Sequence, residues 1–325
     1  MANKERVCLT TYIYGVRYQA YIPFLVYSCH KSYPEYDIRL YLHDNLDTDI
    51  KRQLEMIDIH NVTIIECHFG DCPHITPLKA KSLRWVLWDE KFLEYDYLYI
   101  VDIDMIYIRE PIPLHEQHVI HMNTTGLPYD NLVRHFTRLP FKLINVLYRI
   151  KMAGFIAFPK YLFGSRMDKR VTGLHFINVK DYFQVMNYDI CEKYKKMIYN
   201  GRFVKMCLST NNESFLYEIL AQVGLQPNML PIQTDSCKML DYNCPERQEF
   251  RPHHGIHLGI FRQDLKSKGK RDLILDSDVY SFYMEKYKRE YLTDPLFVRL
   301  VESSPDGIKC QLDNLNRYYG VTVFS

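Results

Sequence analysis

One short segment constrains the fold of this chain more than any other. Residues 97–101 form an uncharged run of tyrosine, leucine, isoleucine and valine that leads directly into Asp102 and Asp104. Such a run is typical of a strand buried on both faces of a parallel sheet. Open α/β sheets bind ligands beyond the carboxyl ends of their strands, and residues two apart on a strand point to the same side. The two carboxylates therefore predict a site for Mg²⁺ or Mn²⁺, with phosphate oxygens of a nucleotide diphosphate completing the metal's shell.

The same pattern of an apolar run followed by two aspartates recurs near the C-terminus, at Asp276 and Asp278. The first copy has a longer apolar lead, and a second apolar run and two prolines follow it. We therefore assign the metal to Asp102 and Asp104. We expect Asp276 and Asp278 to cap a helix that begins near Val279.

The composition excludes several classes of protein. The chain has 325 residues, is 47% hydrophobic and has a net charge of +2, which argues against nucleic-acid binding as its main role. It has nine cysteines, an odd number without a CxxC pair, as expected for thiols in a reducing compartment. The N-terminus is charged, and no apolar stretch is long enough to span a membrane. We therefore expect a cytoplasmic protein without a transmembrane segment.

Strands and helices alternate in the first half of the chain, which predicts an α/β fold with a Rossmann-like, mostly parallel, doubly wound sheet. The expected strands are residues 7–10, 38–43, 62–67, 97–101 and 171–179. The expected helices are residues 18–28, 47–57 (capped by Asp47), 82–93, 181–187, 190–199 and 212–223.

We predict one domain over residues 1–265, with two halves at about 1–125 and 126–265. A helical and irregular extension follows at residues 266–325, and its many basic and tyrosine residues fit a solvated surface or a contact with a membrane surface.

Four segments between residues 7 and 262, in this order and spacing, resemble nucleotide-sugar-dependent glycosyltransferases of the GT-A fold, in particular the glycogenin and bacterial lipopolysaccharide galactosyltransferase group. They are the opening strand and loop with Thr10, Thr11, Tyr12 and Tyr14, the segment Ser82 to Trp85 with Arg84, the motif Asp102, Ile103 and Asp104, and the strand that begins at Thr172 and Gly173. The resemblance implies that these residues contact the donor, that residues at about 1–125 form the nucleotide-sugar half of the domain, and that residues at about 126–265 form the acceptor half. It also implies a UDP-sugar donor and a glycan, lipid-linked or protein acceptor.

Two segments depart from the family pattern. Where the family has an acidic helix start that faces the reacting sugar, this chain has two asparagines and then Glu213. The family's third metal ligand is a histidine followed by a glycine and a Lys-Pro-Trp sequence. In this chain His257 is followed by Gly259 and Arg262. This segment is one residue shorter than the family's and lacks the Lys-Pro-Trp sequence. The resemblance implies His257 as that ligand, ahead of His253 and His254, and an imidazole ligand favours Mn²⁺ over Mg²⁺.

Breaking the bond between a sugar and a nucleotide diphosphate leaves negative charge on the departing diphosphate. A divalent cation neutralises such charge, and Arg84, Arg262 and Lys266 are candidate cations for the phosphate oxygens. Arg84 also fits a surface helix, and the basic run around Lys266 also fits a solvated loop.

Glu213 is the candidate catalytic residue by resemblance. It would be the general base if the transfer inverts the sugar configuration, or would stabilise the cationic sugar if the configuration is retained. A glutamate at a helix start also stabilises the helix dipole, and Asp181 and Asp189 are the alternatives for the base. Two other functions remain open: an aspartate-dependent phosphotransferase or phosphatase, and a binding module for nucleotide sugars or carbohydrates that has no catalytic activity.

Overall fold

The computed structural model describes residues 5–57, 59–70, 75–131, 133–137, 167–171, 174–203, 206, 212–225, 254–262, 275 and 278–321. These residues divide into two units. Unit 1 contains Met1–Gly70, Val101–Gln117 and Pro252–Ser325, and unit 2 contains Asp71–Ile100 and His118–Arg251. The C-terminal sixty residues, expected as an extension, therefore belong to the same unit as the N-terminal strands.

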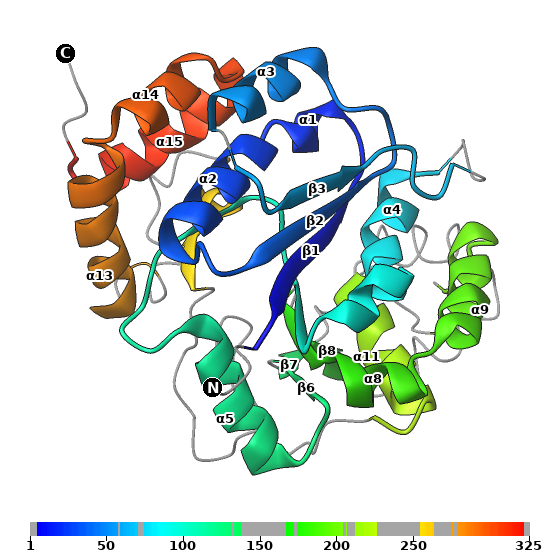
Figure 1. Ribbon diagram of the computed structural model, residues 1–325. Helices are drawn as coiled ribbons and strands as arrows, with labels where there is room; N and C mark the ends of the chain where they lie inside the picture. Colours follow the sequence, from blue (N-terminus) through cyan, green and yellow to red (C-terminus); the bar gives the residue numbers. More distant parts are fainter. Residues whose placement is uncertain are drawn as a thin grey trace. The chain divides into compact units, whose positions relative to one another are not determined.

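Unit 1 contains a parallel sheet in the order β3-β2-β1 (Figure 1). The strands are β1 (Val7–Ile13), β2 (Asp37–Leu42) and β3 (Val62–Ile65), at the positions that the sequence predicts. All residues of β1 are buried, as expected for a central strand. β3 stops before Cys67, whose φ of 53° does not fit a strand.

Helices α1 (Val16–Gln19) and α2 (Ile22–Ser32) lie between β1 and β2 in the chain, and α3 (Thr48–Ile57) lies between β2 and β3. The cap predicted for α3 is confirmed, because the Asp47 carboxylate accepts from the backbone N–H groups of Asp49 and Ile50 at 2.9 and 3.4 Å. The α/β class and the alternation of strand and helix are thus confirmed in this unit.

The C-terminal part of unit 1 is helical, as predicted. It contains α13 (Asp278–Lys286), a π-helical turn (Tyr287–Tyr291), α14 (Pro295–Glu302) and α15 (Asp306–Tyr318). α14 packs against α2 and α3, so these helices extend the core of the unit (Figure 1). Many tyrosines are structural: three of them, Tyr280, Tyr283 and Tyr287, have 0% exposure.

Unit 2 contains the strands β4 (Tyr97–Ile100), β9 (His175–Asn178) and β6 (Tyr129–Asp130), which pair antiparallel in that order. A second antiparallel pair joins β7 (Val133–Thr137) to β8 (Met167–Val171). The helices are α4 (Pro77–Leu83), α8 (Val179–Val185), α9 (Tyr188–Tyr199), α11 (Asn212–Gln222) and most of α5 (Leu114–Thr125). The apolar strand at β4 is confirmed, and all four of its residues are buried.

The helix expected over residues 82–93 is wrong. α4 ends at Leu83, and two separate 3₁₀ turns follow, Arg84–Val86 and Glu90–Glu94. Three consecutive side chains, Trp85, Val86 and Leu87, are buried. The backbone is extended at Leu87 and Asp89, and the Asp89 carboxylate accepts from the backbone N–H of Lys91 at 2.9 Å, which starts the second turn as a separate element.

Within the described segments, no helix combines the length and the apolar composition needed to cross a bilayer. The cysteines that the structure describes, Cys8, Cys29, Cys67, Cys191 and Cys310, are free thiols.

His175 on β9 is a fully buried histidine held in its neutral form. Asn131 donates its side-chain N–H to Nδ1 at 2.9 Å, which leaves Nε2 to donate to the Tyr182 hydroxyl at 3.2 Å. Burial lowers the pKa of His175 to about 3. Protonation of His175 in the folded state would place an N–H donor on Nδ1, directly facing the N–H donor of the Asn131 side chain.

We therefore predict that acid destabilises the protein through His175. Below pH about 6.5 the unfolded chain binds a proton that the folded chain does not accept, so the free energy of unfolding falls by up to about 1.4 kcal/mol per pH unit between about pH 6.5 and 3. Urea denaturation at several pH values measures this slope. His175→Gln, which keeps one acceptor and one donor, should flatten it, and an unchanged slope in that variant would contradict the assignment.

Candidate metal and nucleotide site

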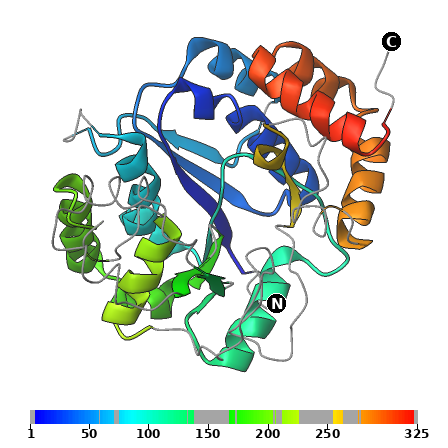
Figure 2. The same cartoon turned by 180° about the vertical axis from the view of Figure 1, so that it is seen from behind.

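A short antiparallel ladder in unit 1 carries the candidate site. It pairs β5 (Met105–Tyr107) with β10 (Gly255–His257), and its register places His257 opposite Met105. The residue after His257 extends the ladder, because its backbone N–H donates to the carbonyl oxygen of Asp104 at 2.9 Å. Figure 2 shows β10 in yellow beside the orange α13. The ladder thus brings His257 to Asp104, 153 positions earlier in the chain.

Asp104 is the centre of a charged cluster. Its Oδ1 lies 3.1 Å from Nε2 of His257, and its Oδ2 accepts from the Arg262 guanidinium at 2.6 Å. Burial opposes a charge on Asp104, but His257 and Arg262 outweigh it and hold the pKa of Asp104 well below its usual range. Burial also opposes the charged form of His257, but Asp104, with a further contribution from Asp102, raises the pKa of His257 above its usual value.

Two glycines allow a close approach of the backbone, Gly255 across the ladder and Gly259 beside the charged cluster. A Cβ on Gly255 would lie 2.1 Å from the carbonyl oxygen of Ile106, across the ladder. A Cβ on Gly259 would lie 2.3 Å from Oδ2 of Asp104 and 3.0 Å from Nε2 of His257. Carbon cannot approach an oxygen to about 2 Å, so a side chain at Gly255 would displace the ladder backbone and one at Gly259 would displace the Asp104 carboxylate.

The described segments contain no group of three or more His, Cys, Asp or Glu side chains arranged to hold a metal. The separation of Asp104 and His257 nevertheless fits two adjacent ligands of one cation. Neighbouring corners of an octahedron with bonds of about 2.1 Å are about 3 Å apart, and the two atoms lie 3.1 Å apart. A carboxylate oxygen and an imidazole nitrogen are both ligands that Mn²⁺ accepts.

The predicted motif residues differ in their surroundings. Asp102 and Asp104 lie between β4 and β5 and outside both strands, so the strand period that predicts their shared direction does not apply. Asp104 is buried, Asp102 is partly buried, and Ile103 is 7% exposed. His257, and not His254, faces Asp104, because the described contact of His254 is with Glu110 at 2.8 Å.

An aromatic group lies at the carboxyl ends of β1 and β2. The Tyr12 hydroxyl and His43 Nδ1 are 2.7 Å apart, and the Tyr14 ring lies 5.1 Å from the His43 ring. Phe69 packs 5.3 Å from Tyr12. The sequence interpretation missed His43 and Phe69, although His43 directly follows a predicted strand at the sheet edge where ligands bind. Thr10 and Thr11 on β1 have buried side chains, as do Tyr12 and His43.

Arg84 and Glu213 belong to unit 2. The Arg84 guanidinium lies 4.1 Å from the centre of the Trp85 ring. Glu213 is partly buried in the first turn of α11. Asn212 donates to the carbonyl oxygen of Lys81 at 3.4 Å, which brings the start of α11 to the last turn of α4, just before Arg84.

The other candidate residues lie at helix starts or outside the described residues. Asp181 and Asp189 are exposed in the first turns of α8 and α9. Asp278 begins α13, close to the predicted helix start. Thr172, Gly173, His253, Lys266 and Asp276 lie outside the described residues.

No family model matches this chain, and no curated protein matches it. Among solved structures it is similar to the mannosyltransferase Ktr4p from S. cerevisiae, with 10% identity and a TM-score of 0.41 over 61% of this chain and 62% of that one. It is similar to the galactosyltransferase LgtC, with 15% identity and a TM-score of 0.29 over 60% of this chain and 70% of that one. It is also similar to the glycosyltransferase GlyE of Streptococcus pneumoniae TIGR4, with 11% identity and a TM-score of 0.38 over 98% of this chain and 64% of that one. This chain thus matches less than two thirds of the length of Ktr4p and GlyE, and these identities and TM-scores are too low to transfer a reaction or a ligand.

Proposed function

We propose that this protein is a metal-dependent glycosyltransferase that moves a sugar from a nucleotide-sugar donor, with UDP-sugars the first choice, to a hydroxyl group of a glycan, lipid-linked or protein acceptor. The observation that carries the proposal is the cluster of Asp104, His257 and Arg262, with the two contacts of Asp104 at 3.1 and 2.6 Å. It joins two candidate metal ligands to a cation suited to phosphate oxygens.

Asp104 and His257 would hold Mn²⁺, or Mg²⁺, with Asp102 as the next candidate ligand. When bound, the metal supplies positive charge that stabilises the departing nucleotide diphosphate. The Arg262 guanidinium, which is about one third exposed at 34%, can donate to the same phosphate oxygens. Tyr14, which is partly exposed, offers a ring face on which a nucleobase can stack.

Glu213 is the proposed catalytic residue at the acceptor. In an inverting reaction its carboxylate would accept the proton of the acceptor hydroxyl while the hydroxyl oxygen attacks the anomeric carbon. In a retaining reaction the same carboxylate would stabilise positive charge on the sugar. Arg84 and, outside the described residues, Thr172, Gly173 and Lys266 remain proposed donor contacts by resemblance.

The pKa of Asp104 argues against the phosphotransferase alternative. In that chemistry the second aspartate of the motif must carry a proton and then release it. The neighbouring His257 and Arg262 hold the pKa of Asp104 well below its usual range. Asp104 therefore stays ionised at neutral pH and makes a poor general acid.

A panel of nucleotide sugars tests the proposal. We expect Mn²⁺-dependent release of UDP from at least one UDP-sugar, with GDP-sugars tested next, and no hydrolysis of an aryl phosphate. Calorimetry with UDP and GDP, in Mn²⁺ and in chelator, provides the binding control. Equal nucleotide affinity in both conditions would contradict the metal site, and metal-dependent binding without turnover on any donor would favour the binding module.

A further inference from the structure

Two pairs of a histidine and a carboxylate stand at opposite ends of the β5–β10 ladder. His257 ends β10 and faces Asp104, which directly precedes β5. At the other end, His254 directly precedes β10 and faces Glu110, three residues after β5. The proposed reaction uses only the first pair, so the second pair needs a separate explanation.

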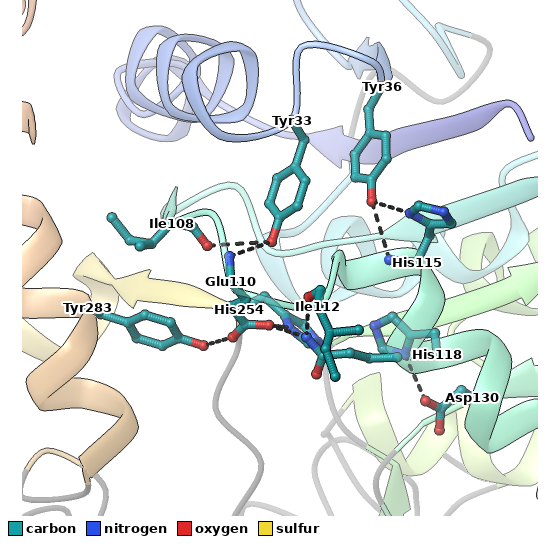
Figure 3. Close-up of polar contacts among 11 residues, drawn as sticks. Tyr33, Tyr36, Ile108, Glu110, Ile112, His115, His118, Asp130, His254 and Tyr283 are labelled. Atoms are coloured by element: carbon teal, nitrogen blue, oxygen red, sulfur yellow. Dashed lines mark hydrogen bonds and ion pairs between the residues drawn. The ribbon is translucent and has the colours of Figure 1, made fainter. Parts of the chain in front are cut away.

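Polar contacts to its carboxylate and to its backbone N–H fix the position of Glu110 (Figure 3). Its Oε2 lies 2.8 Å from Nδ1 of His254 and also accepts from the Gln117 amide, while the Tyr283 hydroxyl donates to Oε1. Its backbone N–H points to the Tyr33 hydroxyl at 3.4 Å. Burial opposes the charge on this carboxylate, but His254 and these donors lower the pKa of Glu110 to about 2.

His254 has an unusual backbone conformation. Its φ is 60°, in the left-handed region that side chains other than glycine seldom adopt. The carbonyl oxygen of His254 accepts from the backbone N–H of Ile108 at 3.3 Å, which continues the ladder beyond β10. The contact with Glu110 thus fixes the residue at which the chain turns into the ladder.

Helix α13 holds both ends of the same ladder. The Tyr280 hydroxyl accepts from the backbone N–H of His257 at 3.3 Å, and one helical turn later Tyr283 donates to Glu110. Lys286 donates to the carbonyl oxygen of Arg109 at 3.1 Å. A shift of the ladder by one residue would turn every side chain to the opposite face and would move His257 away from Asp104.

We propose that Glu110 is a positioning residue for the metal site: by holding His254 and Tyr283 it fixes the register of the ladder and hence the place of the His257 imidazole against Asp104. The link to metal affinity rests on the proposed function, whereas the link to the place of His257 does not.

Glu110→Gln tests this inference, because it keeps the size of the side chain but places an amide where donors converge. We expect the Kd of Mn²⁺, measured by electron paramagnetic resonance without any donor sugar, to rise about 10- to 100-fold, as is usual when the partners that orient metal ligands are changed. We also expect the ring signals of His257 to shift in the NMR spectrum of the metal-free protein, although Glu110 has no described contact with that ring.

The matched control is Glu35→Gln. Glu35 forms an ion pair with Arg109, the neighbour of Glu110, and has no described contact with β10. This variant should keep the Mn²⁺ affinity and the His257 signals, even if its melting temperature falls. If Glu110→Gln does not fold, Tyr283→Phe removes one donor to Glu110 and should give a smaller change of the same kind.

Mn²⁺ affinity within twofold of wild type and unshifted His257 signals in a folded Glu110→Gln or Tyr283→Phe protein would overturn the inference. If the wild-type protein itself does not bind Mn²⁺, the proposed function fails, and the His257 signals alone then decide whether Glu110 positions that ring.

Discussion

Asp104→Asn is expected to lower turnover by about three orders of magnitude and to remove the Mn²⁺ dependence of nucleotide binding. The substitution keeps the shape of the side chain but removes the negative charge that His257 and Arg262 face at 3.1 and 2.6 Å. A metal contributes several kcal/mol of charge stabilisation in such reactions, and each 1.36 kcal/mol corresponds to about a factor of ten in rate. Steady-state kinetics and calorimetry with UDP measure the two effects.

The second aspartate pair of the sequence provides the control. Asp278 is exposed in the first turn of α13, so Asp278→Asn should leave turnover and Mn²⁺ affinity close to wild type. A reversed outcome, with the loss in Asp278→Asn and wild-type behaviour in Asp104→Asn, would place the metal at the other pair.

Glu213→Gln is expected to lower kcat by about two to four orders of magnitude with little change in donor affinity, as the loss of a general base usually does. The glutamine keeps the position of Glu213 in the first turn of α11 but cannot accept a proton. Single-turnover measurements with the donor identified by the panel, together with donor binding, separate the chemical step from affinity.

Asp189→Asn is the matched control, because Asp189 occupies the first turn of α9 as Glu213 occupies that of α11. It should retain turnover. Near-normal turnover in Glu213→Gln would refute the role of Glu213, and a parallel loss in Asp189→Asn or Asp181→Asn would identify the residue that has it.

Local sequence signals predicted the first half of unit 1 well. β1, β2 and β3 coincide with apolar runs of the sequence. The capping of α3 by Asp47 was predictable because a side-chain cap depends only on residues within one helical turn. The helix over residues 82–93 was wrong because the backbone is extended at Leu87 and Asp89, and Asp89 caps a separate turn.

The candidate site was predictable in its residue types but not in its contacts. The resemblance identified His257, and charge identified Arg262, but only the ladder shows that both side chains meet Asp104. Glu110 and His254 were harder to find: no local pattern marks Glu110, and its partners His254 and Tyr283 lie 144 and 173 residues away in the sequence. The antiparallel pairing of β4 with β9 is likewise invisible in a pattern of alternating strands and helices.

The ladder also determines when the site can form during synthesis. β5 is made early, yet its partner β10 follows only after the segment His118–Arg251 of unit 2 has been added. At about 5 to 20 residues per second, a ribosome needs about 7 to 27 seconds for that interval. A nascent chain therefore carries Asp104 for seconds without His257 or Arg262, and closing so long a loop is entropically costly. Unit 1 therefore cannot be completed until the segment His118–Arg251 of unit 2 has been made, and its charged centre forms only after that interval.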